Sequence, residues 1–210
     1  MNYFLKNSSK IKFKEKRSEF VAHSVSIYSV DKLNTYLKQL KSEYPTARHF
    51  CWAYRIEEND SIIENSSDAG EPSGSAGLPI LNVLKSENLV NCSVVVIRYF
   101  GGVKLGKQGL IKAYKTAAEK VIAESDKAKW EPISSYLLTA DMKYFGSITH
   151  CIQQFNGKIK SDHSGEILKI LIKIQDSNFK DFSKSFNEMT QNSGEIKKQS
   201  EHDQTKEVRK

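Results

Sequence analysis

The spacing of apolar residues along the first part of the chain predicts strands around a single helix. Residues 30–44 follow a helical period, with Leu33, Leu37 and Leu40 on one face, and Pro45 then ends the helix. Apolar and polar residues alternate on either side of this segment, as in half-buried strands. The expected strands are residues 11–14, 20–27 and 49–56.

An apolar run followed by glycines and cations marks the next part of the chain. Residues 94–97 are all apolar, and a glycine-rich loop separates them from a predicted helix at residues 108–124. The N–H groups of a first helical turn have no partner within the helix and attract anions. We therefore predict a phosphate-binding or nucleic-acid-binding site made by Arg98, Tyr99, Phe100, Gly101, Gly102, Lys104, Gly106, Lys107 and Lys112.

The residues of this loop allow two other interpretations. Residues 101–107 fit the Gly-x-x-x-x-Gly-Lys spacing of nucleoside triphosphatases, but Gln108 stands where that motif needs a hydroxyl for magnesium. The sequence therefore argues against nucleotide hydrolysis. The glycines could also serve only a tight connection from strand to helix, which would leave the cations and aromatic residues around them unexplained.

A second loop, at residues 66–79, is rich in Gly, Ser and Pro and precedes an apolar helix at residues 80–89. Its Ser75 lacks the glycine of a nucleophile elbow, because Ser73 occupies that position. Carboxylates in such a loop either cap turns or form part of a site. If the protein has a catalytic pocket, we expect its walls to include His49, Asp68, Glu71 and Ser75. No catalytic residue, metal or cofactor is predicted.

Both loops resemble the signature of the IMPACT family, whose bacterial members are called YigZ-like. The resemblance rests on Val-Val-x-Arg-Tyr-Phe-Gly-Gly-x-x-Leu-Gly at residues 95–106, on the acidic loop, and on the basic-Ser-x-Phe element at residues 17–20. The acidic loop departs from the family pattern at Ala69, Ser75 and Leu78. The losses of an acid and of a lysine weaken a metal site and an anion contact there.

The resemblance implies a fold and a biological context. It implies an N-terminal domain similar to domain IV of elongation factor G and to a small-subunit ribosomal protein, followed by a ferredoxin-like domain similar to domain V of that factor. Eukaryotic relatives regulate translation under stress. RNA or the ribosome is therefore the expected partner, although a shared fold does not by itself fix a function.

The second half of the chain predicts the order β-α-β-β-α-β. Its expected elements are residues 136–140, 144–155, 157–161, 166–174, 178–190 and 195–198. This is the split order of ferredoxin-like domains. The overall fold class is therefore α+β, with an N-terminal α/β sandwich at residues 1–127, a linker at 128–135, a ferredoxin-like domain at 136–198 and a disordered tail at 199–210.

The composition limits the kinds of partner and the cellular compartment that we expect. The 210 residues carry a formal charge of +7, which favours a polyanionic partner, although scattered lysines also serve solubility. The three cysteines fit no zinc or redox spacing and indicate a reducing compartment. No apolar run reaches the length of a membrane span, so a cytoplasmic protein without a membrane partner is expected.

Three hypotheses of function follow. The first is a non-catalytic protein that binds RNA or the ribosome through the glycine-rich loop and acts in translation. The second is a small-molecule-binding or hydrolytic enzyme with a pocket between the two loops. The third is a protein-interaction module, in which the C-terminal domain offers its sheet or an edge strand to a partner.

Overall fold

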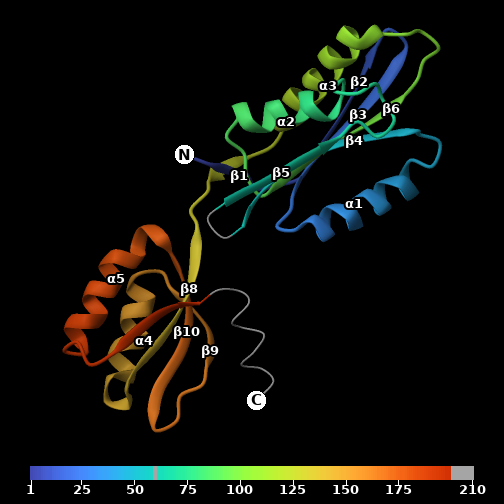
Figure 1. Cartoon of the computed structure of the whole chain (residues 1–210). Coiled ribbons are helices and arrows are strands. Elements are labelled where there is room, and N and C mark those ends of the chain that lie inside the picture. Colours follow the sequence, from blue (N-terminus) through green and yellow to red (C-terminus); the bar gives the residue numbers. More distant parts are fainter. Residues whose placement is uncertain (59–60, 200–210) are drawn as a thin grey trace. The chain divides into compact units, whose positions relative to one another are not determined.

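The computed structural model describes residues 1–58 and 61–199, and its contacts divide the chain into two compact units, Met1–Trp130 and Glu131–Lys210 (Figure 1). Both units combine helices with antiparallel sheets, which confirms the α+β class. None of the described helices is both long enough and apolar enough to cross a bilayer.

A five-stranded antiparallel sheet organises the first unit, in the order β2-β3-β6-β4-β5. The strands expected at residues 11–14, 20–27, 49–56 and 94–97 are present within two residues of their expected bounds, and a further strand at Ser61–Ser67 was not predicted. The five ranges are β2 Ser9–Glu15, β3 Ser18–Ser26, β4 His49–Glu58, β5 Ser61–Ser67 and β6 Cys92–Tyr99.

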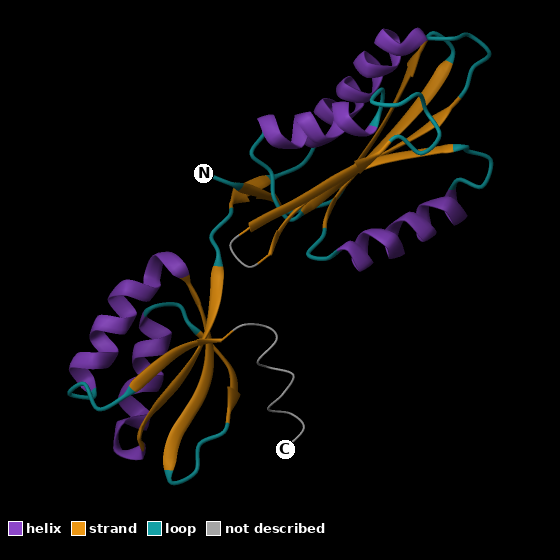
Figure 2. Ribbon diagram, in the orientation of Figure 1, coloured by secondary structure: helices purple, strands orange, loops and turns teal. Residues whose placement is uncertain are grey.

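Helices cover both faces of this sheet (Figure 2). One face holds α1, Val30–Glu43, whose N-terminus is capped by the Ser29 side chain accepting from the Lys32 N–H. The other face holds α2, Gly77–Ser86, and α3, Gly106–Ala123. The sheet is therefore the middle of three layers.

The central strand β6 is buried on both faces, which accounts for the uninterrupted apolar run at residues 94–97. Val94 and Val96 pack into the core under α2 and α3, whereas Val95 and Ile97 pack on the α1 side. Successive side chains of a strand point to opposite faces, and here both faces are buried. The same alternation directs Arg98 toward the α2 and α3 side.

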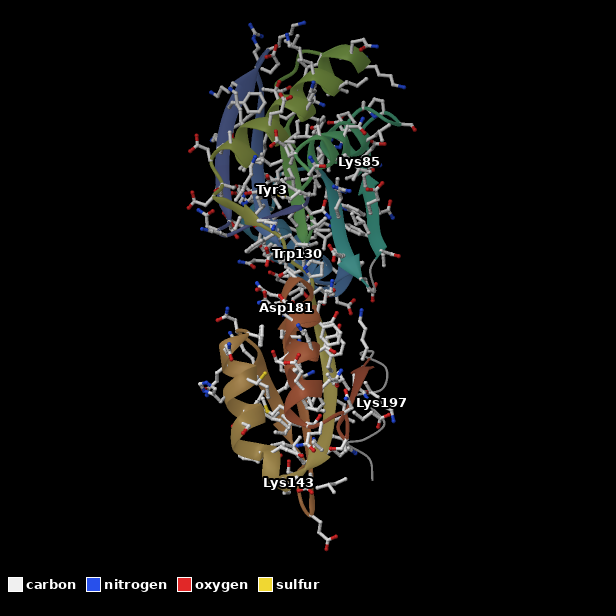
Figure 3. All side chains as sticks on the ribbon, turned by 90° about the vertical axis from the view of Figure 1, so that its left-hand side faces the viewer. Tyr3, Lys85, Trp130, Lys143, Asp181 and Lys197 are labelled. Carbon is white, nitrogen blue, oxygen red and sulfur yellow. The ribbon has the colours of Figure 1, made fainter. Side chains whose placement is uncertain are left out.

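A small second sheet corrects the predicted linker. Strand β1, Tyr3–Leu5, pairs with β7, Lys127–Lys129, which overlaps the predicted linker at 128–135 in its first two residues. Trp130 (labelled in Figure 3) packs edge-on against Phe4. The prediction missed this because a three-residue strand has too few residues to show alternation.

The second unit has the predicted order of elements. Its sheet is antiparallel in the order β11-β8-β10-β9, and α4 and α5 cover one face (Figure 2). The elements are β8 Ile133–Asp141, a 3₁₀ turn Met142–Tyr144, α4 Phe145–Gln154, β9 Lys158–Asp162, β10 Ile167–Gln175, α5 Asp176–Met189 and β11 Glu195–Gln199. Gln199, expected in the tail, belongs to β11, and residues 200–210 lie outside the described residues.

Candidate nucleic-acid interface

The glycine-rich loop after β6 lies against the hairpin that joins β2 to β3. A Cβ atom on Gly101 would stand 1.9 Å from the backbone oxygen of Arg17, so only glycine permits this approach. The Gly101 N–H also donates to the Ser18 hydroxyl, at 3.4 Å. The loop and the hairpin tip therefore form one surface, built from segments more than 80 residues apart in the chain.

The hairpin tip itself carries two cations in an unusual backbone conformation. Because Glu15 pairs with Ser18, only Lys16 and Arg17 make the turn, and their φ angles are 43° and 67°. Two-residue hairpin loops require positive φ and ordinarily use Asn or Gly. Lys16 and Arg17 were not predicted as site residues, although two basic residues between two alternating strands could have indicated the tip.

Most of the residues predicted to hold phosphate are exposed on this surface. Lys104, Lys107 and Lys112 all reach solvent, and the Phe100 ring is 56% exposed. Tyr99, in contrast, packs against the core on the α1 side, as strand alternation requires. Helix α3 begins after Leu105, which supplies no side-chain cap to the first N–H groups. We call the exposed set the loop surface: Lys16, Arg17, Phe100, Lys104, Lys107 and Lys112.

Arg98 lies beneath the loop surface rather than on it, which corrects its predicted role as a phosphate ligand. Its Nη1 donates to the Glu71 Oε1 at 2.7 Å, and both side chains are at most 6% exposed. Its Nη2 donates to the Ser18 hydroxyl at 3.2 Å. The guanidinium also lies 5.7 Å from the Phe20 ring centroid and 5.4 Å from that of Phe100. Arg98 therefore joins the two loops to each other.

A tyrosine and a cysteine extend this buried network. The Tyr114 hydroxyl, on α3, donates to Glu71 Oε1 at 2.8 Å, and the Cys51 thiol lies 3.3 Å from the same hydroxyl. Burial raises the pKa of the Cys51 thiol to about 12, so the thiol stays protonated near neutral pH. Tyr114 carried no signal in the sequence beyond its place on the apolar face of a helix.

Asp68 stabilises the loop at residues 66–79 and accepts hydrogen bonds from backbone N–H groups at the start of α2. Its carboxylate accepts the N–H groups of Gly74, Ala76 and Gly77, each at 2.9 Å. Burial opposes ionisation, but these three hydrogen bonds outweigh it and lower the pKa of the Asp68 carboxyl. These bonds also explain why α2 begins at Gly77, three residues before its expected start.

The remaining residues of the predicted pocket are engaged within the protein. Ser75 is buried, and its hydroxyl donates to the Pro72 carbonyl at 2.6 Å. The His49 Nδ1 donates to the Ala69 carbonyl at 3.1 Å. The structure thus places Asp68, Glu71 and Ser75 in one loop, with His49 at the start of β4 bonded to it, and each of these side chains bonds to the protein itself. The catalytic pocket stays a prediction, and the described residues hold no cluster of three metal-ligating side chains.

Residues 16–122, from the hairpin tip to the end of α3, match the Impact N-terminal domain family. The chain belongs to the IMPACT family. Its relatives include the IMPACT family member YvyE of Bacillus subtilis, 31% identical over 86% of this chain and 83% of the relative. The family member YigZ of Escherichia coli is 31% identical over 73% of this chain and 76% of the relative.

A crystal structure described as that of a hypothetical protein shares the fold. It covers 95% of this chain and 97% of its own, with a TM-score of 0.74 and 24% sequence identity. The likeness therefore extends beyond the family-matched region into the second unit, and it concerns the fold alone.

Proposed function

We propose that this IMPACT family member binds RNA, free or within the ribosome, through the loop surface, and that it acts in translation or its regulation. The observation that carries the proposal is the convergence of exposed cations from the hairpin tip and from the start of α3. The similarity to elongation factor G domains and a cytoplasmic location, both expected from the sequence, belong to this proposal.

Phosphate binding is the physical basis of the contact. Lys16, Arg17, Lys104 and Lys107 provide positive charge, and the uncapped first turn of α3 adds backbone N–H groups. Backbone strain at the hairpin tip supports a role for its two cations, because ordinary turn residues would fit the same φ angles more easily. Such contacts bind RNA with little preference for sequence.

Phe100 adds a platform for a base. One side of its ring faces the Arg98 guanidinium, while more than half of the side chain is exposed. Stacking of a base on an exposed aromatic ring contributes about 1–3 kcal/mol. The buried Arg98 therefore supports binding indirectly, by holding the ring in place from below.

Fluorescence anisotropy with a labelled single-stranded RNA and a ribosomal RNA hairpin, measured across a salt series, tests the proposal. The Lys104→Ala/Lys107→Ala variant removes two phosphate contacts, so the slope of log K against log salt should fall by about 1.4. A matched control, Lys38→Ala/Lys41→Ala, removes the same charge from exposed positions on α1, across the sheet.

The two variants separate a local contact from a general charge effect. We expect the control to retain the affinity and slope of the unchanged protein. Equal losses in both variants would mean that net charge alone attracts RNA, and unchanged binding in the loop variant would exclude these lysines.

A further inference from the structure

Helices cover one face of the sheet of the second unit, and no described helix covers the other, although Ser135 and Leu137 of β8 are buried there. Leu168, Ile170 and Ile172 of β10 are fully buried in the core under α4 and α5. The residues between them point the opposite way, where no described helix or strand of this unit lies (Figure 2). Register places on that face a set we call the lysine face: Lys158, Lys169, Lys173 and Lys197.

Two of these lysines stand directly opposite each other. Lys158 on β9 pairs in register with Lys173 on β10, and both are exposed. Like charges at directly opposed positions destabilise a sheet. The same cross-strand row continues through Ser135 on β8 and Gln199 on β11, neither of which is acidic. Within the described part of the chain, no acid forms an ion pair with Lys158 or Lys173.

The other rows of the face add hydroxyl groups and two acids that are already paired. Glu195 forms an ion pair with Lys197 at 2.9 Å, and Lys197 is labelled in Figure 3. Asp141, opposite Ile167 at one end of the face, lies 3.5 Å from Lys143. Thr139 and Ser161 offer hydroxyl groups beside the lysines, and Leu137 and Leu171 lie between them. No aromatic residue of the four strands lies on this face, so the chemistry suits phosphate groups and not base stacking.

We propose that the lysine face is a second phosphate-binding surface, which contacts the RNA backbone independently of base sequence. Charge complementarity selects this occupant, because a polyphosphate would relieve the repulsion between Lys158 and Lys173. The inference rests on the proposed function in one respect: the same RNA would contact both surfaces. Two linked surfaces then bind more tightly than either alone.

The lysine face can be tested apart from the loop surface with a labelled oligouridylate. Lys158→Ala/Lys173→Ala should weaken binding about tenfold at roughly 0.1 M salt and lower the salt slope by about 1.4. The matched control is Lys180→Ala/Lys184→Ala, which removes two exposed lysines from α5, on the covered side of the sheet. It should bind as the unchanged protein does.

A second measurement keeps the test independent of folding. Because the variant removes a like-charge pair, its melting temperature without RNA should stay constant or rise while its affinity falls. Loss of affinity together with a lower melting temperature would overturn the inference, as would equal binding by the variant and its α5 control. If labelled polyglutamate bound the unchanged protein and lost affinity in the variant while oligouridylate binding stayed normal, an acidic protein would be the occupant and RNA would be excluded.

The loop variant Lys104→Ala/Lys107→Ala distinguishes this inference from the proposed function. Weaker binding in the loop variant with normal binding in the lysine-face variant would refute the inference and retain the proposed function. The reverse result would support the lysine face and refute the loop surface.

Discussion

Arg98 and the two lysines that follow it show how differently cations of one short segment can be used. Arg98 is 5% exposed and bonded to Glu71 and Ser18, whereas Lys104 and Lys107 are exposed on the loop surface. The planar guanidinium can donate in several fixed directions, which suits a buried site with several acceptors. The ammonium is a strongly hydrated point charge, which suits a solvent-exposed contact with phosphate.

The glycine-rich loop motif therefore combines a residue that stabilises the fold, Arg98, with residues exposed to solvent, Lys104 and Lys107. The position of Arg98 in the alternation of β6 directs it into the core, whereas Lys104 lies in the loop after the strand and Lys107 in the first turn of α3. A buried ion pair is costly to form, and breaking it by removing one partner costs more.

Removing the partner of Arg98 should cause the largest loss. Glu71→Ala leaves a buried guanidinium without its carboxylate, so we expect the free energy of unfolding to fall by about 3–5 kcal/mol in urea titrations. As a control, Glu119→Ala breaks the exposed pair with Lys115 and should cost less than about 0.5 kcal/mol. An equal loss of stability in both variants would show that Arg98 is hydrated. Arg98 would then again be a candidate phosphate ligand.

A methyl group on Gly101 should separate the loop from the hairpin. Gly101→Ala would force the backbone away from Arg17, with an expected cost of about 2–3 kcal/mol and weaker RNA binding. Gly146→Ala is the matched control, because its Cβ would meet no atom within 4 Å, and a helical Gly→Ala change is normally stabilising. Thermal melting measures both. A Gly101→Ala protein as stable as the control would contradict the close approach.

Asp68 should make a smaller, pH-dependent contribution. Its pKa is lowered in the folded protein, so its stabilisation is complete above the unfolded value near 3.9 and is lost as the pH falls through the folded value. Asp68→Asn should therefore reduce the free energy of unfolding by about 1 kcal/mol near neutral pH, as the loss of a helix cap does. The difference should shrink in urea titrations on acidification toward about pH 2.5. A difference independent of pH would mean that the carboxylate charge is not what holds the three N–H groups.

Lys112 is the loop-surface residue that lies furthest along α3. Lys112→Ala should lower the salt slope of RNA binding by about 0.7 and leave the free energy of unfolding unchanged. Lys120→Ala, near the C-terminal end of α3, is the control and should leave the slope unchanged. Equal effects from both changes would extend the contact along the whole helix.

Some of the site followed from sequence and some did not. The strand, loop and helix around the glycines lie close to their expected bounds, but Tyr99, predicted as a binding residue, is partly buried on the α1 side. The sequence did not indicate that the hairpin tip meets the glycine loop, or that Tyr114 joins Glu71. Those contacts join residues far apart in the chain, and periodicity reports only on neighbours.

The α+β class, the order of elements in the second unit and the resemblance to the IMPACT family could all be predicted from the sequence, because each depends on local periodicity or on a contiguous motif. Which cations are buried became clear only from the tertiary structure. The energy of a charged group depends on what surrounds it, and the carboxylate that holds Arg98 comes from a loop 27 residues earlier. The lysine face likewise exists only because strand register brings Lys158 and Lys173 together.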